Sequence, residues 1–195
     1  MTTAVRSLSH VRSIHGQLIL ATGFACLTAL GALVQIPIGP VPITLQVLFV
    51  ILAGLVLGSR LGALSQIEYL AIGLAGAPVF AQGKFGLMAL LSPTAGYLVG
   101  FVAMAYVVGL VAESASRPGR ARLFVAGLLG IPVLYVFGAI WLATWLAMAN
   151  GTSWTAELAS AWQLGVIPFI IPDAGKALAA SGVALSGRAL LGLLK

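Results

Sequence analysis

Residues 166–180 read VIPFIIPDAGKALAA, and in this stretch two ionisable side chains, Asp173 and Lys176, stand among apolar neighbours. Apolar sequence continues on both sides, so we expect the segment to be buried in a membrane. A charged side chain at the centre of a bilayer costs about 2.5–3.5 kcal/mol on insertion scales, and such residues usually mark a functional site. Because the two residues are three positions apart, they share one face of a helix. They are therefore the first candidates for a ligand-binding site.

The residue before this pair, Pro172, suits the first turn of a helix, where its missing amide hydrogen is no loss. Asp173 is then expected near a helix N-terminus, where the helix dipole favours an anion. A carboxylate and an ammonium one turn apart offer an acceptor and a donor to one small polar ligand. The alternative interpretation is an ion pair that only holds helices together, although apolar residues would serve that purpose at lower cost.

The composition of the whole chain is that of an integral membrane protein. Of its 195 residues, 61% are hydrophobic and only 7% are charged, and the mean hydropathy is +1.11. A soluble domain carries roughly 25% charged residues. The apolar runs are long and lack the alternation of a β-barrel, so we expect an all-α fold whose spans are helices.

The hydropathy pattern predicts a bundle of six transmembrane helices. A tail of residues 1–16 precedes a single transmembrane domain of residues 17–195. Three prolines between residues 37 and 42 end the first span, and residues 150–163 are expected to form an outer connection with Trp154 and Trp162 at the membrane interface. The six expected spans are residues 17–36, 44–57, 61–76, 95–111, 123–148 and 165–185.

The distribution of basic residues tests this count. Six spans place both termini on one face, and that face then holds eight of the ten basic residues, which is the asymmetry expected of a cytoplasmic face. We therefore expect both termini in the cytoplasm and the chain in the cytoplasmic (inner) membrane, in contact with lipid. Because the basic residues are dispersed between spans, the net charge of +6 does not predict nucleic-acid binding. The eight residues are Arg6, Arg12, Arg60, Arg117, Arg120, Arg122, Arg188 and Lys195.

Other spans and loops contain further candidates. The outer loop of residues 78–86 combines aromatic side chains with donors, a composition that suits the lid of an apolar pocket, although it also suits an ordinary surface loop. Glu68, an acid within the third span, is expected to form a structural pair. The candidates for the pocket, besides Asp173 and Lys176, are Phe80, Gln82 and Lys84 of the loop, Tyr97 as an apolar wall and Gln46 as a polar neighbour.

Small residues recur at helical spacing. In the first span, Ala21, Ala25 and Ala29 form a smooth stripe that suits either a second protein or internal packing. The glycines that recur every four residues at 54–62 and 96–100 are expected to pack helices within the bundle.

Motifs for catalysis are missing from the sequence. A P-loop needs Gly-Lys followed by Ser or Thr, but both Gly-Lys pairs, at residues 83–84 and 175–176, are followed by a hydrophobic residue. Only four acidic residues are present, and the single Cys26 makes neither an intrachain disulfide nor a metal site. We therefore expect no enzyme, no catalytic residue, no metal and no cofactor.

Four segments together resemble the BioY family, the biotin-specific S components of energy-coupling-factor (ECF) vitamin transporters. The segments are VPITLQ at residues 41–46, YLAIGLAGAPVF at 69–80, SPTAGY at 92–97 followed by Gly100-Phe101, and IPDAGK at 171–176. The resemblance implies a six-helix S-component fold and capture of biotin from outside, with Asp173 and Lys176 on the ureido ring. Some members use an Asn of the outer loop, where this chain has Gln82 and Lys84.

The resemblance also implies partners. The stripe Ala21, Ala25 and Ala29 would dock on a transmembrane coupling protein driven by two ATPase subunits, which fits the missing P-loop. Two other classes remain open from the residues alone: a carrier for another small solute, and a small membrane enzyme acting on lipid, with Glu68 or Asp173 as its base.

Overall fold

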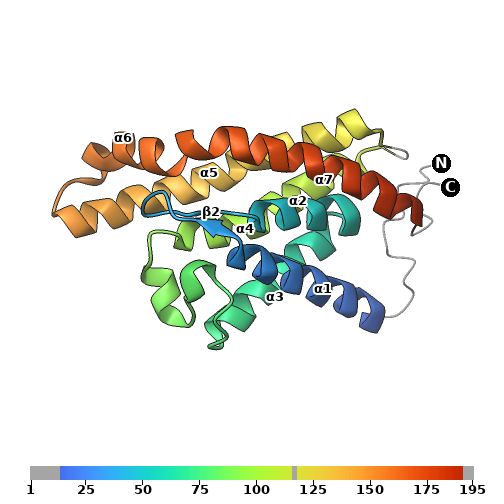
Figure 1. Cartoon of the computed structure of the whole chain (residues 1–195), viewed down its shortest axis with the longest axis horizontal. Helices are drawn as coiled ribbons and strands as arrows, with labels where there is room; N and C mark the ends of the chain where they lie inside the picture. The colour runs from blue at the N-terminus through green and yellow to red at the C-terminus, as the bar shows by residue number, and fades with distance from the viewer. Residues whose placement is uncertain (1–13, 116–117, 191–195) are drawn as a thin grey trace.

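The computed structural model describes residues 14–115 and 118–190, of which the last four are described by their backbone alone. Helices make up most of this part, and they pack side by side into an elongated bundle (Figure 1). The main helices are α1 (Ile14–Leu33), α2 (Gln46–Leu57), α3 (Ser59–Leu74), α4 (Ala95–Glu113), α5 (Arg120–Asn150), α6 (Trp154–Gly165) and α7 (Ile170–Leu190).

Four helical segments of the described chain are long and apolar enough to cross a membrane. They are Ile14–Leu33, Ala95–Glu113, Arg120–Asn150 and the consecutive helices of Trp154–Ser186. Their outer faces expose large hydrophobic side chains such as Ile171, which is 83% exposed. A surface of this kind is suited to lipid rather than to water. Of the other two expected spans, α2 has 12 residues and α3 has 16, so neither reaches the length of a straight span.

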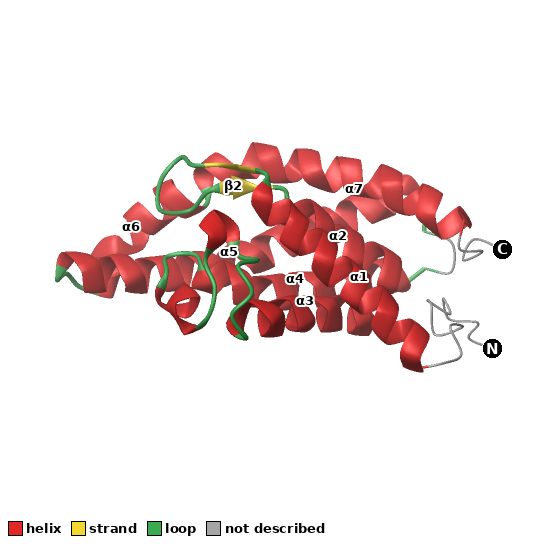
Figure 2. Cartoon of the chain, turned by 60° about the horizontal axis from the view of Figure 1, so that its bottom comes forward, coloured by secondary structure: helices red, strands yellow, loops and turns green. Residues whose placement is uncertain are grey.

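The helix termini and the connections between helices lie at two opposite ends of the bundle. The start of α1, the start of α5 and the end of α7 lie at one end (right in Figures 1 and 2). The strand pair and the turn from α5 to α6 lie toward the opposite end (left in both views). The described termini therefore share one end, as the charge distribution predicts. Of the basic residues in that argument, Arg6, Arg12, Arg117 and Lys195 lie outside the described residues.

Two local expectations are wrong. The first helix ends at Leu33 rather than at residue 36, and the chain then forms strands β1 (Gln35–Ile36) and β2 (Ile43–Thr44), which pair antiparallel. The prolines between them exclude a helix and favour extended backbone in the residues that precede them. This small pairing is the one departure of the described chain from an all-α fold.

The expected connection of residues 150–163 is mostly the helix α6. Ser153 caps its N-terminus, since the Ser153 hydroxyl accepts from the amide of Ala156 at 3.3 Å. Glu157 in the first turn accepts from Asn150 and Thr152. The sequence contains a helix-start signal here, a Ser at the cap with an acid in the first turn, but Trp154 and Trp162 suit a connection at the membrane interface equally well. Trp154 and Trp162 are both exposed on this helix.

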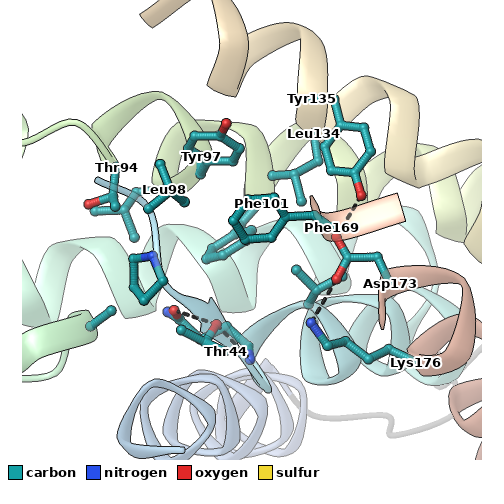
Figure 3. Close-up of a pocket in the computed structure, with 15 residues that line it drawn as sticks. Thr44, Thr94, Tyr97, Leu98, Phe101, Leu134, Tyr135, Phe169, Asp173 and Lys176 are labelled. Carbon is teal, nitrogen blue, oxygen red and sulfur yellow. Dashed lines mark hydrogen bonds and ion pairs between the residues drawn. The ribbon is translucent and has the colours of Figure 1, made fainter. Parts of the chain in front are cut away.

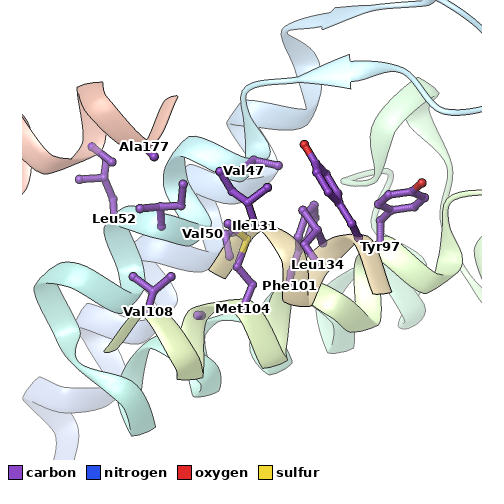
Figure 4. Packing of buried hydrophobic residues seen from close by; sticks show 14 of the residues in the cluster. Val47, Val50, Leu52, Tyr97, Phe101, Met104, Val108, Ile131, Leu134 and Ala177 are labelled. Carbon is purple, nitrogen blue, oxygen red and sulfur yellow. The ribbon is translucent and has the colours of Figure 1, made fainter. Parts of the chain in front are cut away.

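The core surrounds α2, which contacts α1, α3, α4 and α7. Ten of its twelve residues are buried, and Val50, Val47 and Leu52 lie among side chains of neighbouring helices (Figure 4). Glycines bring the helices close, as predicted: a Cβ on Gly62 would meet the Cα of Gly54 at 3.0 Å. A helix buried on nearly all sides holds its N-terminal residue, Gln46, in a fixed place.

Candidate functional site

A cavity lies toward the end of the bundle that holds the strand pair, between β2, α2, α4, α5 and α7 (Figure 3). It encloses about 510 Å³ of space between atoms, including its opening, and the part that the centre of a water molecule can reach is about 40 Å³. Its walls are mostly apolar, with a few polar groups at defined places, which is the usual character of a small-molecule site. The lining residues are Val41, Pro42, Thr44, Gln46, Val47, Ala81, Thr94, Tyr97, Leu98, Phe101, Leu134, Tyr135, Phe169, Asp173 and Lys176.

The Asp173–Lys176 pair lies in the wall of this cavity. Asp173 is in the first turn of α7, where the aligned backbone dipoles favour its negative charge. The Nζ of Lys176 lies 2.7 Å from Oδ1 of Asp173, and the two residues are 9% and 1% exposed. The expectation that both charges are buried on one helix face is therefore confirmed by the geometry. Oδ2 of Asp173 accepts a hydrogen bond of 2.9 Å from the hydroxyl of Tyr135 in α5.

Gln46 is held by a second polar network across the cavity. Its Nε2 donates to the hydroxyl of Tyr69 at 2.7 Å, and its Oε1 accepts from Thr44 at 3.0 Å. The hydroxyl of Tyr69 in turn donates to the carbonyl of Val79 at 3.1 Å. These bonds tie the start of α2 to α3 and to the loop that follows it, so the amide of Gln46 presents a fixed polar edge to the cavity.

Tyr97 also lines the cavity, as an apolar wall that is anchored at its far end. Its hydroxyl donates to the carbonyl of Gly165 at 2.7 Å. Two glycines make room for the ring, because a Cβ on Gly138 would overlap the ring and a Cβ on Gly165 would overlap the hydroxyl. The position of this wall therefore depends on α5 and on the end of α6.

The outer-loop candidates lie outside the lining of this cavity. Phe80 is buried and packs edge-on against Tyr69, with ring centroids 5.3 Å apart. Gln82 is exposed and has a φ of +64°. Its backbone N–H donates to the side-chain Oε1 of Gln35. Lys84 is half-buried, and burial lowers the pKa of its ammonium below the ordinary value. Their contact with a ligand stays a prediction, whereas Ala81 between them does line the cavity.

The alanine stripe is largely used inside the chain. Ala21 and Ala25 are 0% and 1% exposed, whereas Ala29 is half-buried. The face of α1 that bears the first two alanines packs on its neighbours α2 and α3. Internal packing, one of the two interpretations of the alanine stripe, is therefore observed for two of its three residues.

Glu68 forms the expected structural pair, since it accepts from the hydroxyl of Thr22 at 2.8 Å.

The sequence analysis missed three polar residues that line the cavity, Thr44, Thr94 and Tyr135, and the one that bonds to Asp173 is Tyr135. It lies in the middle of the apolar fifth span, three residues after Pro132, with no charged neighbour in the sequence. A tyrosine in the middle of a membrane span can indicate a buried polar contact, because a buried hydroxyl needs a hydrogen-bond partner. Nothing in the local sequence identifies Asp173 as that partner.

An apolar helical bundle with a narrow cavity, in which an acid, an amine and a phenol are buried together, defines a membrane protein that binds a small polar solute. The chain belongs to the BioY family, whose profile matches residues 1–192. It is therefore a multi-pass membrane protein of a transporter family and not an enzyme.

Several relatives are similar over most of their length. The probable biotin transporter BioY of Pyrococcus horikoshii is 42% identical over 158 residues, which cover 80% of this chain and 86% of that protein. The biotin transporter BioY of Thermotoga maritima is 38% identical over 169 residues, covering 87% and 94%. That of Rhizobium etli is 40% identical over 184 residues, covering 89% and 92%.

A solved structure has the same fold. It is the crystal structure of the S-component for biotin from an ECF-type ABC transporter, which matches with a TM-score of 0.75 and 25% sequence identity. The match covers 97% of this chain and 95% of that one. The S-component fold expected from the sequence is therefore confirmed.

Proposed function

We propose that this chain is the biotin-binding S component of an ECF-type transporter and takes up biotin across the membrane. The observation that carries the proposal is the buried Asp173–Lys176 pair, which lines a mostly apolar cavity in a chain of the BioY family. Relatives of similar length are named biotin transporters, and the matching crystal structure is an S component for biotin.

The chemistry of the cavity suits a cyclic urea joined to an apolar chain. Asp173 can accept from a ureido N–H group, and Lys176 can donate to the ureido carbonyl or to the ligand carboxylate. Apolar side chains such as Phe101 and Leu98 suit the rings and methylene groups of the ligand. The part of the cavity that the centre of a water molecule can reach is only about 40 Å³. A ligand with two rings and an acidic chain is larger than this space, so its entry requires the lining side chains to move apart.

We propose that α2 and α3 complete six spans and that the end with the termini faces the cytoplasm. The positive residues assigned to that face support this orientation. The cavity then lies toward the outer side of the cytoplasmic membrane, from which biotin arrives. Residues 1–16 would be a cytoplasmic tail.

The energy for uptake would come from partners, since the sequence has no P-loop. We propose a transmembrane coupling protein and ATPase subunits in this role, with docking through the first helix. Because Ala21 and Ala25 pack internally, the half-buried Ala29 is the member of the stripe that a partner can reach without rearrangement of α1.

Equilibrium binding of labelled biotin to the purified full-length chain in detergent tests the proposal. We expect unlabelled biotin to displace the label and lipoic acid, which has a similar acidic chain but no cyclic urea, to leave it bound. Asp173→Asn should weaken binding by at least ~1.5 kcal/mol, the usual worth of a hydrogen bond to a charged group. Glu68→Gln, which changes a carboxylate outside the cavity, is the matched control. Displacement by lipoic acid, or equal affinity of the Asp173→Asn variant and the parent, would reject the proposed ligand site.

A further inference from the structure

We propose that Tyr135 is a positioning residue of the ligand site, which orients the carboxylate of Asp173 so that its remaining lone pairs face the cavity. This inference rests on the proposed function and adds to it a residue that touches the binding carboxylate from a second helix. It is carried by the hydrogen bond of 2.9 Å from the Tyr135 hydroxyl to Oδ2 of Asp173.

The first argument concerns the two oxygens of the carboxylate. Lys176 donates to Oδ1 and Tyr135 donates to Oδ2, so each oxygen has one protein donor (Figure 3). An ionised carboxylate has about four acceptor sites. Two sites therefore remain, one on each oxygen, and donors on the two oxygens leave the plane of the carboxylate little freedom to rotate. A ligand must present N–H or O–H donors to these sites.

The second argument concerns the helices. Lys176 and Asp173 lie on the same helix, so their contact alone fixes nothing relative to the rest of the cavity wall. Tyr135 belongs to α5, and its bond places the carboxylate relative to a second helix. Asp173 and Tyr135 are 1% and 8% exposed, so water has little access to replace this bond. A hydrogen bond to a charged group in such a place is stronger than one between neutral groups.

The third argument concerns the other side of the tyrosine ring. Tyr135 also lines a second, apolar hollow between α5, α6 and α7, together with Ile131, Val136 and Ala174. The ring therefore lies between the ligand cavity and this hollow. Apart from Tyr135, the only described lining residues of the hollow with a polar group in the side chain are Trp154 and Trp162. Among the described residues, Asp173 is the partner found for the hydroxyl, so the oxygen is needed for that contact and the ring fills space.

Tyr135→Phe is the appropriate variant, because it removes the oxygen and keeps the ring. We expect biotin affinity to fall at least about tenfold, as for the loss of one hydrogen bond to a charged group. Tyr106→Phe, at an exposed tyrosine of α4, is the matched control and should bind like the parent.

An infrared measurement without ligand distinguishes positioning from packing. The chain has only four Asp and Glu residues, so the carboxylate band of Asp173 can be isolated as the difference between the parent and Asp173→Asn spectra. We expect this band to shift in Tyr135→Phe and to stay in place in Tyr106→Phe. An affinity of Tyr135→Phe equal to that of the parent would overturn the proposal, as would a loss of affinity without a band shift. If the parent chain itself does not bind biotin, the proposed function fails, while the band shift still reports whether Tyr135 orients the carboxylate.

Discussion

The ammonium of Lys176 lies 2.7 Å from Oδ1 of Asp173, one helical turn earlier in α7, and both residues are buried. Each charge compensates the other in a place where water cannot. Removing one partner leaves an uncompensated buried charge, whereas neutral replacement of both does not. This asymmetry makes it possible to separate stability from ligand binding.

We expect Lys176→Met to lower the free energy of unfolding by about 3–5 kcal/mol, because it leaves the carboxylate unpaired. The double variant Asp173→Asn, Lys176→Met should recover most of that loss and still bind biotin weakly or not at all. Thermal unfolding in detergent and equilibrium biotin binding check the two halves of the prediction. A double variant with parental affinity would show that the pair is only structural.

We expect Gly138→Ala to weaken biotin binding, because its methyl group would overlap the Tyr97 ring and push it toward the cavity. Overpacking of this kind also costs about 1–3 kcal/mol of stability. Gly175→Ala, on an open face of α7 where a Cβ meets no atom within 4 Å, is the control and should not lower stability. The Kd for biotin and the melting temperature are the measurements. Parental values of both in Gly138→Ala would show that Tyr97 is not held against α5.

The junction between α2 and α3 provides a test of the packing itself. A Cβ on Gly109 of α4 would overlap the backbone of Ser59, and one turn later Glu113 accepts from the Ser59 amide and hydroxyl at 3.1 and 2.8 Å. We expect Gly109→Ala to destabilise the chain by about 1–3 kcal/mol, since backbone cannot move aside as a side chain can.

The matched variant is Gly23→Ala in α1, where a Cβ meets no atom within 4 Å. It should be neutral or stabilising by up to about 1 kcal/mol, because alanine favours a helix over glycine. Melting temperatures of the two purified variants measure the difference. A Gly109→Ala variant as stable as Gly23→Ala would contradict the close approach of α4.

The loop residue Gln82 tests the ligand contact that the sequence predicts. Its φ of +64° is a left-handed conformation that glycine adopts without the strain of a side chain, which is of order 1 kcal/mol. Gln82→Gly therefore removes the side chain and suits the backbone. If the amide contacts biotin, affinity should fall about three- to tenfold. Gln82→Asn, which keeps an amide and tolerates this backbone, should lose less; equal affinity of all three chains would remove Gln82 from the site.

The sequence by itself determined the membrane class, most helix positions and the buried Asp173–Lys176 pair of the candidate site. Apolar runs interrupted by Pro and Gly mark the helices, because the hydrophobic effect and backbone hydrogen bonding act locally along the chain. Asp173 and Lys176 could be recognised because both charges lie within one helical turn. The helix α6 was missed because Trp154 and Trp162 indicate a position at the membrane interface, which a connection and a short helix satisfy equally well.

Only the tertiary structure decided which distant residues meet. Tyr135 reaches Asp173 across 38 positions of sequence, and Tyr97 reaches Gly165 across 68. The first contact depends on how α5 and α7 are rotated and spaced, and the second on α4 and α6; both are set by packing summed over the whole bundle. For the same reason the sequence could not show that Ala21 and Ala25 pack inward, or that Phe80 lies against Tyr69 and outside the cavity lining.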